Sequence, residues 1–326
     1  MIFSAEEPEF DSFIEISPGV GSPEISILMP VYQQAAFVAD AVFSILSQKG
    51  VVAEIIFSDD ASEDGTYFIA RDCVIAWLKR HPLQHRIILR RGSARLRRDH
   101  LPLLLEKASC DLVFQAHGDD ISHCDRAKIL LYVFRTNPGV TMITSTAKLI
   151  HAAENTLAHE FPAMSPIHQA RHYSMEEILQ GDKHLIGYAM AWSRTAQSGF
   201  TRLDSKLAAV SHDRITAFRA GMAGKVLLIH TPLVNRRVSQ KNWSMNMVIG
   251  KDPQVSRFGW SLIKFSALEV MAGDVLKAEE IGLINRENCR LLTGQIATLQ
   301  ESFKRQMLDA HRVLTGNGFL IHWLEG

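Results

Sequence analysis

Short apolar runs that alternate with helical segments fill the first third of the chain, and they constrain the fold more than any other feature. The runs lie at 25–32, 51–57, 86–89 and 111–115. Because they are largely apolar, they are typical of strands buried on both faces of a sheet. Helical patterns stand between them, at 37–46, 66–79 and 101–108. This alternation predicts a mostly parallel sheet flanked by helices.

The rest of the chain is less regular until it becomes helical near its end. The expected elements are strands at 140–145, 185–192 and 226–229, a helix at 213–223, and helical structure from about 258 onward. We divide the chain into an N-terminal tail at 1–22, a main domain at 23–245 and a helical extension at 246–326. The extension either packs on the main domain, forms a homodimer interface or contacts a membrane surface. A dense Lys/Arg face, which the membrane role favours, is missing from it.

The composition excludes several classes of protein. Of 326 residues, 47% are hydrophobic and 21% charged, with a formal net charge of zero. This is an ordinary globular balance, and it gives no reason to expect a nucleic-acid partner. An acidic N-terminal stretch without an apolar core is no signal peptide, and no run reaches the ~18 apolar residues of a membrane span. The cysteines form no C-x-x-C pair, so we expect free thiols in a cytoplasmic protein: Cys73, Cys110, Cys124 and Cys289.

Polar and acidic residues follow three of the predicted strands. Tyr32 ends the first strand, Asp59 and Asp60 come after the second, and Asp119 and Asp120 come after the fourth. Ligands of parallel sheets bind beyond the carboxyl ends of the strands, because the connecting loops meet there. We therefore expect a ligand site at this edge.

Asp119 and Asp120 have the chemistry of a metal site for a phosphorylated ligand. One or two carboxylates can bind Mg²⁺ or Mn²⁺ while leaving other positions for phosphate oxygens. Gly118 allows an unusual backbone turn just before the pair. Taken alone, however, a Gly-Asp pair after a strand is more often an exposed turn.

The cluster that begins at Asp59 and Asp60 divides into two parts. A carboxylate at the end of a strand can accept hydrogen bonds from a base or from ribose hydroxyls, and we expect this of Asp60. Ser62, Asp64 and Gly65 precede a predicted helix, so turn and capping roles explain them.

Two further polar pairs leave alternatives open. Asp213, preceded by His212, is either the N-cap of a helix or a general base for an acceptor hydroxyl. Arg236 and Arg237 are either solvated arginines at the end of a strand or cations for a diphosphate.

These motifs together resemble the inverting family-2 glycosyltransferases of the GT-A fold. In order along the chain, they are ILMPVY at 27–32, SDDASEDGT at 58–66, GDDIS at 118–122 with Arg126, HDRITAFRA at 212–220 and PLVNRR at 232–237. The similarity covers about residues 24–245. It implies a GT-A (nucleotide-diphospho-sugar transferase) fold, with a mixed, mostly parallel sheet, flanking helices and a C-terminal helical appendage.

The resemblance also implies roles for individual residues. It places the nucleotide-sugar donor, with UDP as the default nucleotide, against Pro30, Val31, Tyr32, Asp60, Asp119, Asp120 and Arg237. Asp120 is implied as the ligand of Mn²⁺ or Mg²⁺, and Asp213 as the catalytic base of a direct, inverting displacement. The acceptor is then a glycan or lipid-linked glycan of a lipopolysaccharide, capsule or other surface polysaccharide, handled at the inner face of the cell membrane.

Some positions depart from the family pattern. His117 and His212 stand where the family usually has acidic residues, and Gln33 stands where it often has Asn. These changes leave the donor and the acceptor open. They are also consistent with a second hypothesis, that the protein is a catalytically inactive relative that binds a nucleotide or a glycan. A phospho-acceptor signalling domain is disfavoured, because such a domain is much shorter and needs neither Asp119 and Asp120 nor Asp213.

Overall fold

The computed structural model describes residues 10–17, 21–151, 170–181, 184–200, 211–238 and 252–315. The chain forms two compact units. The first comprises Met1–Tyr173, Lys183–Ala196 and Gly224–Arg237. The second comprises Ser174–Asp182, Gln197–Ala223 and Val238–Gly326.

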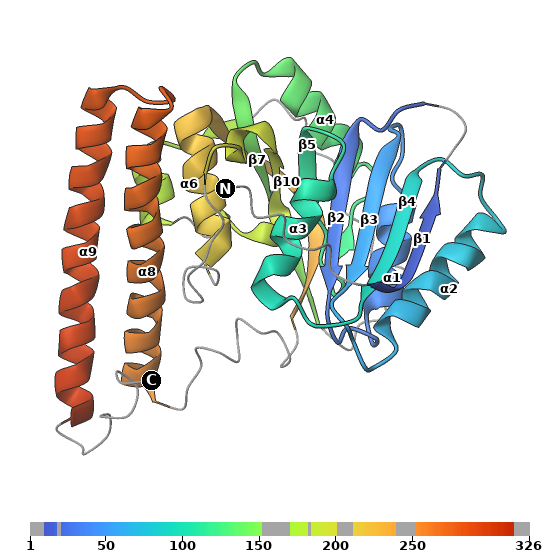
Figure 1. Ribbon diagram of the computed structural model, residues 1–326, viewed down its shortest axis with the longest axis horizontal. Coiled ribbons are helices and arrows are strands. Elements are labelled where there is room, and N and C mark those ends of the chain that lie inside the picture. Colours follow the sequence, from blue (N-terminus) through green and yellow to red (C-terminus); the bar gives the residue numbers. More distant parts are fainter. Residues whose placement is uncertain are drawn as a thin grey trace. The chain divides into compact units, whose positions relative to one another are not determined.

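Among the described residues, one ten-stranded sheet forms the frame of the first unit, in the order β1-β4-β3-β2-β5-β9-β7-β10-β6, with β8 beside β10 (Figure 1). The strands are β1 (Phe10–Ile16), β2 (Ile25–Val31), β3 (Ala53–Asp59), β4 (Arg86–Gly92), β5 (Leu112–Gln115), β6 (Ile121–Ser122), β7 (Val140–His151), β8 (Ala170–His172), β9 (Met190–Ser193) and β10 (Lys225–Val238).

The sheet is mixed, as expected, but its parallel part is confined to four strands. β4, β3, β2 and β5 pair in parallel. β1 pairs antiparallel with β4, and β9 antiparallel with both β5 and β7. The register of β2 on β3 sets Val31 opposite Asp59. The ends of these two strands therefore bring the Tyr32 and Asp60 loops to one edge.

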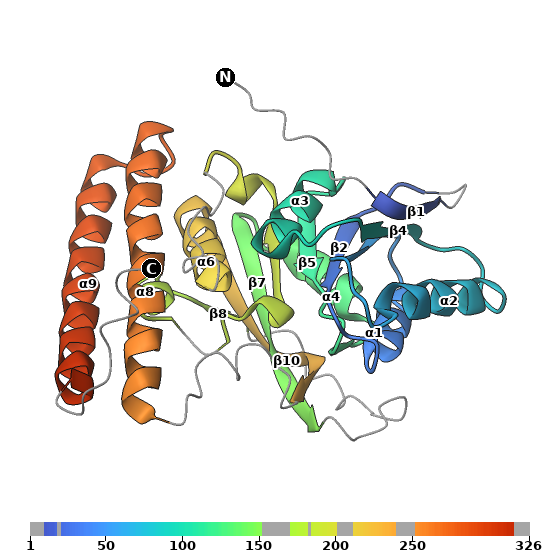
Figure 2. The same ribbon diagram turned by 60° about the horizontal axis from the view of Figure 1, so that its bottom comes forward.

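Helices cover both faces of the parallel part. α1 (Val38–Leu46), α2 (Thr66–Leu78) and α4 (Arg126–Thr136) lie on one face, and α3 (His100–Lys107) lies on the other (Figure 2). The buried residues of α1 recur at helical spacing, at Val38, Ala41, Val42, Ile45 and Leu46. They share one apolar core with β2 and β3, and each fully buried aliphatic side chain contributes roughly 1.5–3 kcal/mol.

The second unit is helical. It contains α5 (Met175–Gln180), α6 (His212–Ala223), α8 (Pro253–Glu280) and α9 (Arg286–Thr315). α8 and α9 run side by side as a long hairpin (Figure 1). The Asp252 side chain caps α8 by accepting N–H bonds from Gln254 (2.6 Å) and Val255 (3.4 Å). Buried positions of α9 recur every three or four residues, at Cys289, Leu292 and Ile296, as packing on a neighbouring helix requires.

A buried ion pair joins the middle of the chain to this hairpin. Arg219 of α6 donates to both carboxylate oxygens of Asp274 on α8, at 2.7 and 2.9 Å. Through contacts of this kind α5 and α6 belong to the second unit, although we had assigned them to a main domain ending at 245. The predicted boundary itself falls within 239–251, outside the described residues.

The predicted N-terminal tail at 1–22 is too long. Residues Phe10–Ile16 form β1, which adds to the edge of the sheet through antiparallel pairing with β4. Residues 1–9 and 18–20 lie outside the described part of the chain. Within that part, every helix is too short or too polar to span a bilayer.

Candidate active site

The loop between β3 and α2 is held by its own side chains. Asp59 accepts the backbone N–H of Ser62 at 3.0 Å and also its hydroxyl. Asp64 accepts the N–H groups of Ala35 (3.0 Å) and Thr66 (3.1 Å). These contacts confirm the turn roles expected for Ser62 and Asp64, because they tie the loop after β2 to the start of α2.

Asp60 is the member of this cluster that faces the loop after β4. Its carboxylate is 4% exposed and accepts the N–H groups of Leu96 (2.5 Å) and Arg97 (2.9 Å). Tyr32 stands nearby, with the guanidinium carbon of Arg95 3.6 Å from its ring centroid. Asp60 and Tyr32 thus share a contact with one loop, as a common ligand subsite requires.

Backbone strain marks the same corner. Gln33, Ala61 and Arg97 all have positive φ, at 53°, 58° and 55°. Residues with a Cβ rarely adopt this conformation, and it costs of order 1 kcal/mol or more at each position. The strained residues directly follow Tyr32, Asp60 and Leu96, so the loops around this corner are held away from their relaxed shapes.

Gly118 is required by close packing in the acidic turn. A Cβ at this position would lie 2.3 Å from Oε1 of Gln34 and 2.7 Å from a methyl carbon of Val31. The turn therefore lies directly on the loop after β2. Val31 is 2% exposed and supports this turn from within, while Pro30 is half-buried at the end of β2.

Asp120 is the buried member of the acidic pair, and Asp119 is partly exposed. One oxygen of Asp120 accepts the backbone N–H of Arg237 at 2.9 Å. The other lies 3.6 Å from Nδ1 of His117. Burial, followed by the charge of Asp119, raises the pKa of Asp120 to about 8, despite the opposing effects of the Arg237 N–H and of Arg236 and Arg126. The protein thus leaves the negative charge at this turn incompletely compensated.

The side chains of this turn have the chemistry of metal ligands. Ligand atoms of His117, Asp119 and Asp120 all lie within 4.8 Å of one another. Carboxylate oxygens and an imidazole nitrogen suit a divalent cation such as Mn²⁺. We had treated His117 only as a departure from the family pattern, and its ring nitrogen beside Asp120 makes it a further candidate ligand.

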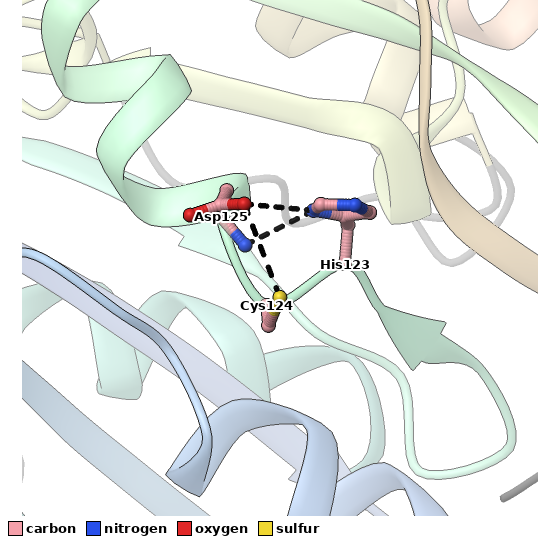
Figure 3. A group of neighbouring side chains, drawn as sticks. All are labelled: His123, Cys124 and Asp125. Atoms are coloured by element: carbon pink, nitrogen blue, oxygen red, sulfur yellow. Dashed lines mark hydrogen bonds and ion pairs between the residues drawn. The ribbon is translucent and has the colours of Figure 1, made fainter. Parts of the chain in front are cut away.

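A second group of neighbouring His, Cys and Asp side chains lies at the start of α4 (Figure 3). Nδ1 of His123 accepts the backbone N–H of Asp125 at 3.0 Å, and the sulfur of Cys124 lies 4.0 Å from a carboxylate oxygen of Asp125. The Gln48 side chain donates to the carbonyl of His123 at 2.8 Å. We assign these three consecutive residues to the turn that begins the helix, since Nδ1 of His123 already serves it.

The two arginines at the end of β10 have different surroundings, because neighbouring residues of a strand point to opposite faces. Arg237 is 2% exposed. Its guanidinium donates to the Asp119 carbonyl (3.1 Å) and to Asp40 of α1 (3.2 Å). Arg236 is partly exposed, lies over the Tyr188 ring at 4.9 Å and is close enough to lower the pKa of Asp120. Arg237 thus braces the acidic turn, while Arg236 is better placed to meet a ligand.

Arg126 supports the acidic turn from its buried side. It is 1% exposed and donates to Ser122 (3.1 Å), to the Gln115 carbonyl (3.3 Å) and to the Tyr188 carbonyl (2.8 Å). Burial lowers its pKa to about 9, against the effect of Asp120. The residue connects the end of β5, β6 and the Tyr188 segment, and so fixes the walls around Asp120.

Asp213 lies in the second unit, in the first turn of α6. Its carboxylate contacts Nδ1 of His212 at 2.8 Å, and both side chains are partly exposed. Burial alone lowers the pKa of His212, but the charge and the hydrogen bond of Asp213 outweigh it and raise that pKa above its ordinary value. A base role for Asp213 stays a prediction.

The family model described as glycosyl transferase family 2 matches residues 26–196, more than half of the chain. The protein therefore belongs to glycosyl transferase family 2. The matched region contains β2, the Asp60 loop and the acidic turn.

Similar proteins agree with this assignment. The putative glycosyltransferase EpsE of Bacillus subtilis (strain 168) is 34% identical over 100 residues, which are 31% of this chain and only 34% of that relative. The crystal structure of S. aureus TarS 1–349 in complex with UDP-GlcNAc is similar with a TM-score of 0.57 and 13% identity, over 88% of this chain and 79% of that one. The corresponding complex with UDP gives 0.56 and 13%, over 86% and 73%. The similarity confirms the GT-A fold.

Proposed function

We propose that this protein transfers a sugar from a nucleoside-diphosphate donor, with UDP as the nucleotide, to a hydroxyl of a glycan acceptor. The observation that carries the proposal is the acidic turn. Asp120 is buried beside Asp119, and the ligand atoms of both lie with those of His117 within 4.8 Å of one another, an arrangement that suits a divalent cation. The chain also belongs to glycosyl transferase family 2, and TarS, which shares its fold, binds UDP and UDP-GlcNAc.

The proposed donor site divides into a nucleoside part and a diphosphate part. Tyr32 offers a ring face for a base, and Asp60 offers two acceptor oxygens for base N–H or ribose hydroxyl groups. Pro30 and Val31 shape the strand end that holds Tyr32. Asp119 contacts the ribose or the sugar, and Asp120, with His117 as a further ligand, holds Mn²⁺ or Mg²⁺. Bound there, a divalent cation supplies positive charge for the departing diphosphate.

Arg236 adds a second positive charge for that diphosphate. Its partial exposure and its position over Tyr188 leave the guanidinium at the margin of the acidic turn. Arg237, which we first proposed as a donor ligand, acts through its backbone N–H to Asp120 and its side-chain bond to the Asp119 carbonyl. We therefore assign Arg237 a positioning role and Arg236 the contact with phosphate.

The proposed reaction is a direct displacement at the anomeric carbon. The acceptor oxygen forms a bond to this carbon while the bond to the diphosphate oxygen breaks. Asp213 takes the proton of the acceptor hydroxyl, and the configuration of the sugar inverts. The acceptor class, a lipopolysaccharide, capsule or similar surface glycan made at the inner face of the membrane, rests on the family resemblance. A homodimer through the C-terminal helices is proposed from their amphipathic stretches alone.

A donor screen tests the proposal. Purified protein is incubated with UDP- and GDP-sugars, with Mn²⁺ or with a chelator, and with glycan acceptors, while release of nucleoside diphosphate is measured. We expect release that requires the metal and is lost in Asp120→Asn. Donor binding without release, together with an Asp213→Asn variant that behaves like the wild type, would instead identify a non-catalytic binding protein.

A further inference from the structure

We propose that the loop 93–97 occupies the nucleoside position of the free protein, and that the donor binds by displacing Arg95 from Tyr32. This inference rests on the proposed function, because it takes Tyr32 and Asp60 as the surfaces that meet the base and the ribose. It goes further by assigning an internal competitor to that subsite. Arg95 then sets how strongly a nucleotide must bind to open it.

The contact of Arg95 with Tyr32 leaves no space for a base on that ring face. The guanidinium carbon lies 3.6 Å from the ring centroid, which is a single stacking distance. A nucleobase on the same face would need this place for itself. Base and guanidinium therefore exclude each other there.

Asp60 is engaged by the same loop. The Leu96 N–H donates to one carboxylate oxygen at 2.5 Å and the Arg97 N–H to the other at 2.9 Å. Nε of Arg95 adds a charge contact at 3.8 Å. Both oxygens that a nucleoside would use are thus taken by the backbone of the loop. A nucleotide that donates to Asp60 must share its oxygens with these two N–H groups or replace them.

The exposure of the loop 93–97 suits a segment that a ligand displaces. The Arg95 side chain is 43% exposed, and Ser93, Ala94 and Arg97 are exposed as well, so little apolar contact holds the loop in place. Arg97 adopts the left-handed region with φ of 55°, a strain that opening would release. The closed state is held by two backbone N–H hydrogen bonds to Asp60 and one stacked guanidinium. Because only the open fraction of the protein binds nucleotide, the apparent affinity is lower than the intrinsic affinity in proportion to that fraction.

Calorimetric titration of UDP tests the inference through the sign of a change. Arg95→Ala removes the stacked cation, so we expect its dissociation constant for UDP to fall by about 3- to 30-fold. Leu96→Pro removes one N–H to Asp60 at a residue whose φ of −86° is close to that of proline, and the same direction is expected. Arg71→Ala is the matched control, since Arg71 lies over Phe68 at 5.4 Å on α2 and its loss should leave UDP binding unchanged.

Amide hydrogen exchange supplies a second readout on the unmodified protein. We expect the Leu96 and Arg97 amides to exchange slowly in the free protein and faster with saturating UDP. Weaker or unchanged UDP binding by Arg95→Ala, or amides equally protected with UDP, overturns the displacement but leaves the proposed function standing. Failure of the wild type and both loop variants to bind any nucleoside diphosphate removes the proposed function as well.

Discussion

The two acidic corners of the sheet edge are similar in sequence but differ in the hydrogen bonds that their carboxylates accept. At the corner after β3, Asp59 accepts from Ser62 and Asp60 from Leu96 and Arg97, so backbone amides and a hydroxyl bond both carboxylates, although burial still raises the pKa of Asp59. At the turn after β5, Asp120 has one backbone N–H and a second carboxylate beside it, and its pKa rises to about 8. A carboxylate satisfied by the protein shapes a loop, whereas one left incompletely compensated is suited to an external cation.

The largest expected effect comes from neutralising the acidic turn. Asp120→Asn keeps an oxygen for the Arg237 N–H but removes the charge, so we expect sugar transfer to fall on the order of 10³-fold. Thermal stability without metal should stay equal or rise, because the folded protein no longer has to bury or protonate a carboxylate beside Asp119. Rates from coupled nucleotide-release assays and melting curves check both parts. A variant that loses stability and keeps its metal-dependent rate would break the contrast between the two corners.

The pair at the end of β10 gives the next largest effect. Arg237→Ala removes a buried guanidinium from Asp40 and from the Asp119 carbonyl, and we expect a loss of about 3 kcal/mol of folding stability. Arg236→Ala is the matched control. It should fold normally and raise the KM for the donor roughly tenfold or more, as expected for one lost charged hydrogen bond. Denaturant titration and donor kinetics separate the two, and exchanged outcomes would return Arg237 to the donor site.

The parallel strands could be predicted to within two or three residues because burial on both faces leaves continuous apolar runs. β1 was missed because its sequence, FDSFIEI, mixes charges with apolar residues and its half-buried position depends on pairing with β4, far along the chain. The packing of α6 with the C-terminal helices could not be predicted for the same reason: the Arg219–Asp274 pair joins residues 55 positions apart, and no local pattern encodes it.

The candidate site shows a similar limit. Residue types at strand ends were enough to select Tyr32, Asp60 and Asp120, since topology brings strand ends together. The hydrogen-bond partners of Asp60 could not be predicted, because they depend on a left-handed backbone at Arg97. Sequence patterns predict that conformation mainly at glycine, and this position is an arginine. The sequence also does not show which of Arg236 and Arg237 is buried, because this depends on which face of β10 packs against the rest of the protein.

A smaller effect is expected from the satisfied corner. Asp59→Asn keeps the shape of the side chain but weakens its bonds from Ser62, and we expect a stability loss of about 1–3 kcal/mol. Donor KM and kcat should change little at temperatures where the variant is folded, since Asp59 holds the loop rather than a ligand. Urea unfolding, followed by kinetics well below the midpoint, measures each. Asp64→Asn, on the same loop, should show the same pattern.

The smallest expected effect is a pH dependence of folding stability at the corner after β3. His100 is buried on α3, with Nε2 2.7 Å from the Ser58 hydroxyl, and burial lowers its pKa to about 4, with a further lowering by Arg90 and an opposing effect of Asp60. The unfolded chain takes up this proton near pH 6.5. Between pH 6.5 and 4 the unfolded state therefore binds more protons, and His100 should remove about 1 kcal/mol of stability per pH unit as the pH falls, with its full contribution present above 6.5.

Comparing the pH dependence of unfolding free energy in the wild type and His100→Gln isolates this part from other histidines. Equal slopes in the two proteins would mean that His100 is already protonated or exposed when folded, and that this corner is less completely satisfied than its hydrogen bonds indicate.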